Sequence, residues 1–391
     1  MKPQPAIAPD PNATPELRSF LLYFLKLGSL GFGGPIALAA HMQRDLVEQR
    51  RWISSQDYAE GLAFAQLSPG PLAAQLAMYL GWIRAGALGA TLAGIVFILP
   101  SFLLVILLSL LYVHYGQLSW IRGTFYGIGA CVVAIIVASA YRLVRSTLKK
   151  DRLLWILFAA LALTTAYEES EIIWLFLLCG FISMAIKAPL RLPQLRFGMS
   201  QLTAVGKLVG SMAVPYSTAR MGPLFLFFLK AGAFVFGSGL AIVPFLYGGV
   251  VQKFHWLTEK QFLDAIAVAM ITPGPVVITA AFIGYVVSGF AGALLASLAV
   301  FAPPYLIVIV GAPHYRRFAQ NRQMKAFVQG VTAAAVGAIV GAAFILGRRS
   351  IIDLPTAAIA VLALVLLMLK KVPEPFLIVG AGIAGLLLTN R

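Results

Sequence analysis

Two short breaks in apolar sequence, related by a fixed offset, constrain this chain more than any other feature. Ser-Pro-Gly-Pro occupies residues 68–71, and Thr-Pro-Gly-Pro occupies residues 272–275, 204 positions later. The same offset relates further pairs of residues: Phe24 and Phe228, Lys26 and Lys230, Gly28 and Gly232, Trp52 and Trp256, and Pro100 and Pro304. An offset that holds without a gap over this length predicts two copies of one unit, each built around a broken helix.

The composition is that of a membrane protein. Of the 391 residues, 60% are hydrophobic and 11% are charged, whereas soluble proteins carry about 25% charged residues. The long apolar runs indicate transmembrane helices. Residues 1–15 form a polar, Pro-rich tail without the apolar core of a signal peptide. We therefore expect an all-α polytopic membrane protein.

The remaining composition argues against a disulfide, a metal centre and a nucleic-acid partner. Cys131 and Cys179 lie in apolar segments and are expected to be free thiols. The four histidines are isolated and show no metal-ligand spacing. The formal net charge is +16, but the Lys and Arg residues lie in short loops, where they orient a membrane protein and attract anionic lipid. We expect no metal, no cofactor and no nucleic acid, with membrane lipid as a partner.

Hydropathy and charge divide the chain into a tail (residues 1–15), an N-terminal repeat (16–187), a basic cytoplasmic linker (188–220) and a C-terminal repeat (221–391). In the first repeat we expect apolar segments at residues 16–49, 55–67, 72–82, 86–115, 121–141, 153–167 and 172–186. In the second we expect them at residues 221–254, 259–271, 275–288 and 289–310. The basic cluster at residues 142–152 is expected to be a cytoplasmic loop.

The segments that flank each break are too short to span a membrane. Each is about 20 Å long at about 1.5 Å per residue, whereas the hydrocarbon core is about 30 Å thick. Each pair therefore forms either a re-entrant hairpin or one broken span. The loop at residues 316–325 is strongly basic, but its counterpart at residues 115–121 has no Lys or Arg. The two equivalent loops are therefore expected on opposite sides of the membrane, which favours inverted repeats, each with about five transmembrane helices plus a re-entrant hairpin. This arrangement places Arg348 and Arg349 outside the cell, and that observation favours parallel repeats instead.

The breaks have the chemistry of an anion site. Proline suits the first position of a helix, because its missing N–H would be unpaired there. Pro71 and Pro275 therefore predict the starts of two helices, whose free N–H groups and dipoles favour an anion. Inverted repeats with such discontinuous helices are typical of secondary transporters. The alternative is two plain kinks, which the equivalent positions of the breaks make the weaker interpretation.

Two pairs of charged residues recur at equivalent positions in apolar surroundings. Lys26 and Lys230 are candidates for binding an anion, because intramembrane lysines are costly and usually functional. The alternative is that they extend to the membrane interface. Glu60 and Asp264 each lie eight residues before the first residue of a break. If buried they can carry a proton, whereas carboxylates at the interface have no such role.

The motifs together resemble those of the chromate ion transporter family in its long, two-domain form. They are Phe-Leu-Lys at residues 24–26 with Gly28, Phe-Gly-Gly-Pro at residues 32–35, Trp52, and the break at residues 68–71. The second half has counterparts at residues 228–239 and 272–275, although it reads Gly-Ser-Gly at residues 237–239 where the first half reads Gly-Gly-Pro. The resemblance implies a multi-pass transporter of the inner membrane that exports chromate, with sulfate as a related oxyanion and no catalysis or bound metal.

The expected oxyanion site combines both breaks with the two lysines. A dianion loses a large solvation energy on entering the membrane, so N–H and ammonium groups must replace its water. The expected substrate-binding residues are Lys26, Gly33, Gly34, Ser68, Gly70, Pro71, Lys230, Gly237, Ser238, Thr272, Gly274 and Pro275, with Glu60 and Asp264 as candidates for proton coupling. The preference between chromate and sulfate, and the formation of a homodimer, are left open.

Other functions are compatible with inverted repeats that contain re-entrant hairpins. They are a membrane enzyme acting on polyprenyl phosphates, a lipid flippase and a channel. The enzyme would need a nucleophile with paired acids or a histidine near the phosphate. Ser68 has no acid or histidine within helical reach, and Thr272 replaces it in the second half. Transport of chromate or another oxyanion is therefore the preferred interpretation, and no enzyme activity is expected.

The inverted arrangement predicts the labelling of two loops. A cysteine introduced at Gln117 should react with an impermeant reagent from outside the cell, and one at Gln320 only from inside, because basic loops stay in the cytoplasm. Labelling of intact cells and of inverted vesicles measures this. If both positions react from the same side, the repeats are parallel and each broken segment is a full span.

Overall fold

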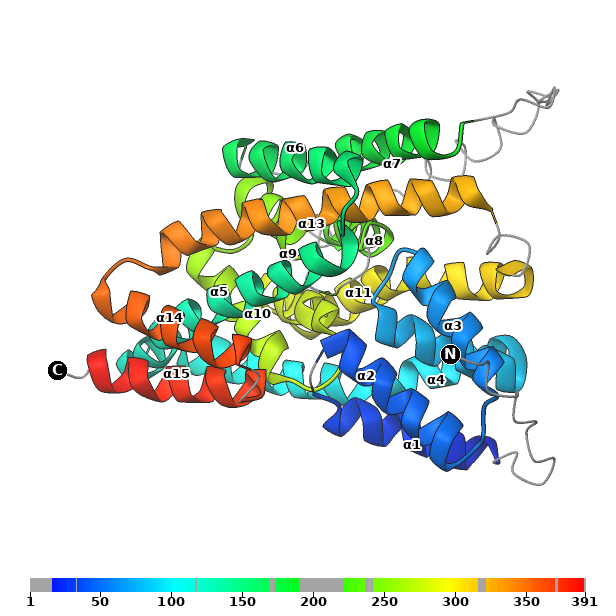
Figure 1. The fold of residues 1–391 in the computed structure, drawn as a ribbon. Helices are drawn as coiled ribbons and strands as arrows, with labels where there is room; N and C mark the ends of the chain where they lie inside the picture. Colours follow the sequence, from blue (N-terminus) through cyan, green and yellow to red (C-terminus); the bar gives the residue numbers. More distant parts are fainter. Residues whose placement is uncertain are drawn as a thin grey trace.

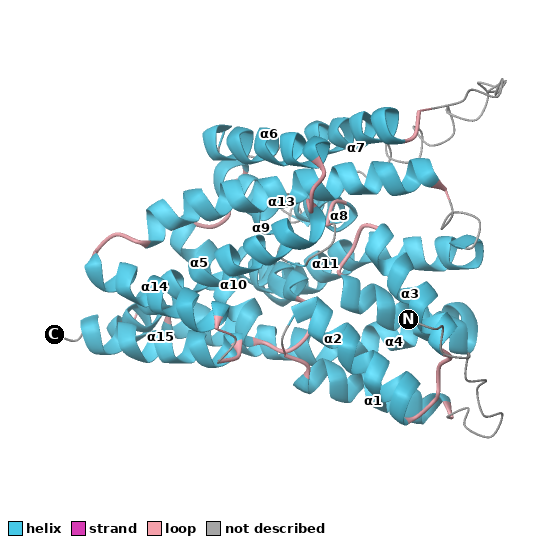
Figure 2. Ribbon diagram, in the orientation of Figure 1, coloured by secondary structure: helices cyan, strands magenta, loops and turns pink. Residues whose placement is uncertain are grey.

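The computed structural model describes residues 16–32, 34–116, 118–168, 173–189, 221–235, 239, 242–315, 321–369 and 372–389. All secondary structure in these ranges is helical (Figure 2). The expected all-α fold is therefore confirmed for the described part of the chain. Gly33, Gly237 and Ser238 lie outside it, as do the labelling positions Gln117 and Gln320.

The helices of the first repeat in these ranges are α1 (Leu17–Leu30), α2 (Gly34–Met42) with the π-helical turn Gln43–Gln49, α3 (Ser55–Leu67), α4 (Leu72–Tyr115), α5 (Ser119–Thr147), α6 (Arg152–Glu168) and α7 (Ile173–Lys187). Those of the second are α8 (Met221–Ala233), α9 (Ile242–Leu246) with the π-helical turn Tyr247–Lys253, α10 (Glu259–Ile271), the 3-10 turn Val276–Ile278, α11 (Thr279–Gly311) with the 3-10 turn Ala312–His314, α13 (Arg322–Ser350), α14 (Leu354–Met368) and α15 (Glu374–Thr389).

The segments expected at residues 55–67 and 259–271 are confirmed to the residue by α3 and α10. Ser54 and Thr258 cap these two helices, each accepting the N–H of the residue three positions on.

Each broken segment is followed by a sharp reversal of the chain. Inside α4, Ala85 and Gly86 have non-helical backbone angles. Gly81 lies before this point and Gly89 after it, and a Cβ on Gly81 would be 2.4 Å from the Gly89 carbonyl oxygen. In a straight helix, eight residues would separate the two glycines by about 12 Å. α4 is therefore two antiparallel helices, and α11 reverses in the same way at residues 288–289.

The helix before the first break and the helix after it lie side by side. The rings of Phe64 in α3 and Tyr79 in α4 are 5.3 Å apart. Closer to the break, the Gln75 amide nitrogen donates to the Ser68 hydroxyl at 3.3 Å. Residues 55–84 therefore form an antiparallel hairpin with Ser-Pro-Gly-Pro at its tip. A re-entrant segment needs this geometry, and its insertion from one side of the membrane stays a prediction.

Several helices match the dimensions of a membrane. In the described ranges, four are long and apolar enough to cross one, within residues 72–115, 120–147, 276–314 and 322–350. Large apolar side chains such as those of Leu107 and Leu298 are exposed on their outer faces, as expected where a protein contacts lipid. These helices support the multi-pass membrane protein expected from the composition, while the number of spans in each repeat stays a prediction.

The two repeats exchange their last helices. α5 packs against α14 and α15 of the other repeat, and α13 packs against α6 and α7 (Figure 1). Glycines at equivalent positions, Gly127 in α5 and Gly330 in α13, make the close contacts. A Cβ on Gly127 would lie 2.0 Å from the Ala381 carbonyl oxygen, and one on Gly330 would lie 2.3 Å from that of Cys179. Small residues allow such close packing of membrane helices.

The offset between the repeats changes by one residue after the second break, which corrects the gap-free offset expected from the sequence. Gly86 in the reversal of α4 corresponds to Gly289 in that of α11, 203 positions later. α5 and α13 also begin and end 203 positions apart. The second break is followed by the 3-10 turn Val276–Ile278, whereas α4 begins as an α-helix, and a 3-10 helix has only about three residues per turn. The pairing of Pro100 with Pro304 therefore shifts by one residue.

We expect Gly127→Ala to lower the stability of the protein in detergent by about 1–3 kcal/mol, because it overpacks a tight contact. The matched control is Gly129→Ala in the same helix, where an added Cβ meets nothing within 4 Å and alanine is the better helix former. Thermal unfolding of the purified variants measures the difference. Equal unfolding temperatures for the two variants would contradict the close packing of α5 on α15.

Candidate functional site

Reciprocal hydrogen bonds from one repeat to the other hold the two Pro-Gly breaks. The Gly70 N–H donates to the Val235 carbonyl oxygen at 2.5 Å, and the Gly274 N–H donates to the Gly31 carbonyl oxygen at 3.1 Å. Gly31 and Val235 are equivalent positions that follow α1 and α8. The breaks of both repeats therefore meet at one place.

Glycine is required at the tips of both hairpins. Gly70 and Gly274 have φ values of +140° and +99°, which residues with a Cβ disfavour. A Cβ on Gly274 would also lie 2.1 Å from the Ser101 hydroxyl oxygen, and one on Gly70 would lie 2.6 Å from the Pro304 ring. Each tip thus packs against the long apolar helix of the other repeat.

The hydroxyl groups at the breaks donate to backbone carbonyl oxygens. Ser68 and Thr272 donate to carbonyl oxygens near the ends of α3 and α10, at 2.6 and 2.8 Å. Ser101 donates to the Pro273 carbonyl oxygen at 2.6 Å. A hydroxyl has one hydrogen to donate, so Ser68 and Thr272 have none left for an anion in this conformation. Their role in substrate binding stays a prediction.

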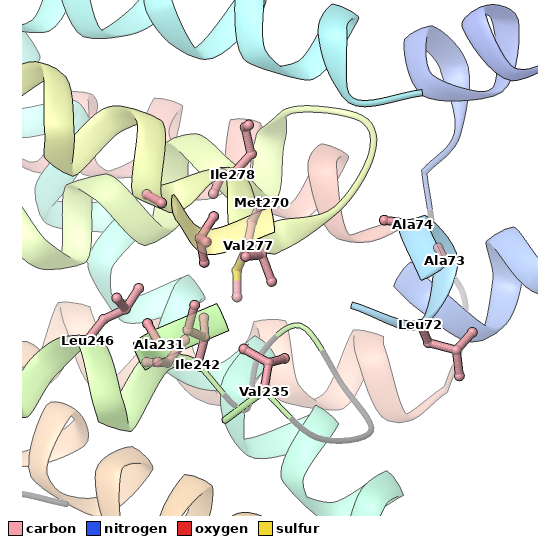
Figure 3. Close-up of a cluster of buried hydrophobic side chains, with 14 of the residues drawn as sticks. Leu72, Ala73, Ala74, Ala231, Val235, Ile242, Leu246, Met270, Val277 and Ile278 are labelled. Carbon is pink, nitrogen blue, oxygen red and sulfur yellow. The ribbon is translucent and has the colours of Figure 1, made fainter. Parts of the chain in front are cut away.

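The helix starts after the two breaks face each other, and Figure 3 shows Leu72 at one start and Val277 at the other. Pro71 and Pro275 precede the first helical residue, one position earlier than expected, and the N–H groups after them still lack helical partners. The space between the two starts is only about 10 Å³, room for about one water molecule. In this conformation an oxyanion does not fit between them.

A second cavity, of about 190 Å³, opens beside the second break. We call it the larger cavity because it exceeds the space between the helix starts. Its volume equals several water molecules of about 30 Å³ each, which is enough for a small tetrahedral ion. The second break and the glycine-containing segments before α2 and α9 line it together with α5 and α15; the lining residues include Gly31, Gly34, Gly239, Thr272, Gly274, Ser139, Arg142, Ser146 and Glu374. Arg142 and Glu374 are the charged residues of this lining, within the described part of the chain.

Arg142 is the cation of this larger cavity, and it is not among the binding residues predicted from the sequence. Its Nη2 donates to Glu374 Oε1 at 3.0 Å and to Ser139 Oγ at 3.1 Å. The expected helix ended at residue 141, which placed Arg142 in a cytoplasmic loop, but α5 continues to Thr147. The signal that could have found it is the three- and four-residue spacing of Ser139, Arg142 and Ser146, which marks one polar face of a helix.

The larger cavity combines two kinds of group that bind oxyanions. α2 begins at Gly34, and the N-terminus of a helix carries roughly half a positive charge. The Arg142 guanidinium adds a full charge and a fork of N–H donors that matches two oxygens of one anion. The arrangement is thus suited to a small oxyanion, while Glu374 contributes the opposing charge.

The two lysines lie elsewhere. Lys26 on α1 and Lys230 on α8 have exposed side chains, and neither lines the larger cavity or the space between the helix starts. Their place in the binding site stays a prediction that this conformation does not support. Of the predicted glycines, Gly34 and Gly274 do line the larger cavity.

The two predicted proton-coupling residues differ in burial. Asp264 is 4% exposed and accepts a hydrogen bond from the Tyr112 hydroxyl at 2.7 Å. It lines a separate cavity of about 250 Å³ together with Arg122 and Lys260. Glu60 is half-buried and accepts from a neighbouring glutamine amide at 3.1 Å. Asp264 therefore has the surroundings expected of a buried carboxylate, and the role of both residues in coupling stays a prediction.

Comparison with known proteins adds independent evidence. The family model described as "Chromate transporter" matches twice, over residues 18–184 and 222–386. The chain is 51% identical to the chromate transport protein of Cupriavidus metallidurans over 378 residues, which cover 95% of this chain and 93% of that protein. It is 50% identical to the probable chromate transport protein of Synechococcus elongatus over 379 residues, 96% of each chain.

A more distant relative is the chromate transport protein of Pseudomonas aeruginosa, 31% identical over 393 residues that cover 96% of this chain and 93% of that one. No solved structure matches the chain. The two family matches fall on the two repeats seen in the sequence, and these relatives are all named as transport proteins. The chain therefore belongs to the chromate transporter family, a family of membrane transporters rather than enzymes.

Proposed function

We propose that this chain exports chromate across the plasma (inner) membrane by secondary active transport, with sulfate as a related substrate. The observation that carries the proposal is the identity of about half of all residues with chromate transport proteins, along almost the whole chain. The larger cavity supports it, because helix N-termini and a guanidinium suit an oxyanion.

The geometry suggests how the anion passes. It enters the larger cavity and binds between Arg142 and the backbone of the second break and of the start of α2. The space between the helix starts holds about one water molecule in this conformation, so passage needs the two hairpin tips to move apart. Rocking of one repeat against the other is the usual way in which transporters with inverted repeats open such a site.

Expression of the chain in a chromate-sensitive bacterium should lower chromate accumulation and raise tolerance, with excess sulfate reducing the effect because the two dianions share charge and shape. Uptake of labelled chromate and growth on chromate plates measure this, with the membrane content of the protein followed by immunoblotting. Unchanged accumulation at a normal membrane content would refute the chromate assignment.

In the same assay, Gly274→Ala should abolish most of the transport. A Cβ there collides with Ser101, and the positive φ adds backbone strain of about 1–3 kcal/mol. The matched control is Gly289→Ala, which also has a positive φ (+62°) but meets nothing within 4 Å and lies at the reversal of α11. Comparable activity in the two variants would show that the tip does not shape the transport site.

Two further variants, Lys26→Gln and Lys230→Gln, are compared with Gly274→Ala in the same transport assay. Both side chains are exposed and lie off the larger cavity, so we expect each variant to retain more transport than Gly274→Ala. Loss of transport equal to that of Gly274→Ala, at a normal membrane content, would instead return the lysines to the binding site.

A further inference from the structure

The ion pair between Arg142 and Glu374 occupies the group that an oxyanion would use. One guanidinium nitrogen, Nη2, contacts the Glu374 carboxylate at 3.0 Å, and Nε donates to the Ala138 carbonyl oxygen at 3.3 Å. The pair joins α5 of the first repeat to the first residue of α15 in the second. Both side chains line the larger cavity, so an anion in this space meets a guanidinium that is already paired.

Within the described lining, the cation of the larger cavity comes from one repeat only. The position equivalent to Arg142 in α13 is Ile345, 203 residues later, whose side chain is buried. The symmetry of the breaks is therefore not extended to the cation. Among the residues of this lining, Arg142 faces one acidic partner, and moving the Glu374 carboxylate away from it changes the net charge beside the guanidinium by a full unit.

The pair is also weak enough to be exchanged. The Arg142 side chain is 53% exposed and that of Glu374 is 25% exposed, and ion pairs with this much exposure contribute only about 0–1 kcal/mol. A carboxylate and a tetrahedral oxyanion present the same kind of oxygen acceptors to a guanidinium. Ser139, which accepts from Nη2 at 3.1 Å, can hold Arg142 in place while its partner changes.

We propose that the Glu374 carboxylate is a built-in competitor, which the transported oxyanion displaces from Arg142. This inference rests on the proposed function of the same site. With Glu374 bound, the pair is neutral and the Nη2 donors of Arg142 are taken by Glu374 and Ser139. When the anion arrives, it takes over the guanidinium, and the partly exposed Glu374 side chain turns away from it. Arg142 is then the substrate-binding cation, and Glu374 sets the affinity.

A double-mutant cycle on the purified full chain tests the competition. Binding of chromate, and separately of sulfate, is measured by titration for the unaltered protein, Glu374→Gln, Arg142→Gln and the double variant. We expect Glu374→Gln to tighten binding roughly twofold to fivefold, the range for a partly exposed ion pair. Arg142→Gln should weaken binding by about tenfold or more. In the Arg142→Gln background, Glu374→Gln should tighten binding less, because only the direct repulsion between the carboxylate and the anion is then removed.

Three controls keep the result specific. Arg145→Gln removes a charge one turn further along α5, outside the cavity lining, and should leave binding unchanged. Glu48→Gln removes an exposed acid from a segment that does not line the cavity and should have no effect either. Arg142→Lys keeps the charge but loses the fork of donors, so it should fall between Arg142→Gln and the unaltered protein. Thermal unfolding of each variant shows that it is folded.

The outcomes separate this inference from the proposed function. If the unaltered protein binds neither chromate nor sulfate, both are overturned. If it binds them and Glu374→Gln leaves the affinity equal or weaker, the competition is overturned while the proposed function stands. The competition is also overturned if Glu374→Gln tightens binding by the same factor in the Arg142→Gln background, because the effect then does not act through Arg142.

Discussion

The structure depends on one constraint, which is that backbone groups inside a membrane protein must find partners within the protein. The hairpin tips interrupt helices inside the protein, and each tip forms a backbone hydrogen bond with the other repeat. Gly70 donates to Val235, and Gly274 donates to Gly31. Because the pairing is reciprocal, neither break is satisfied by its own repeat alone, and the centre of the protein exists only when both repeats are docked.

The two repeats also depend on each other through the packing of α5 and α13. α5 and α13 carry glycines whose backbones touch helices of the opposite repeat, as Gly127 does at Ala381. Van der Waals packing of this kind replaces the hydrophobic driving force that is missing between helices in lipid. The exchange of helices also brings the first residue of α15 against α5, so that Glu374 of the second repeat faces Arg142 of the first. Packing thus sets the electrostatics of the larger cavity.

The backbone of the centre is nearly symmetric, but its charge is not. The breaks, the reversals and the exchanged helices repeat with an offset of 203 or 204 residues. Arg142, in contrast, corresponds to a buried isoleucine in α13. A symmetric backbone gives two equivalent ways to open the centre, which suits alternating access. In the proposed function, the one cation of the described cavity lining gives the anion a single preferred place to bind.

The sequence alone determined the all-helical membrane class, the two repeats, the breaks and the family, because apolar runs and Pro-Gly breaks act over a few residues and leave local patterns. It also located α3 and α10 to the residue. Only the tertiary structure decided that Arg142 meets Glu374, 232 positions away, and that the exposed lysines lie off the larger cavity. The physical reason is that these relations depend on which helix faces pack together, and side chains from distant helices leave no joint pattern in the order of residues.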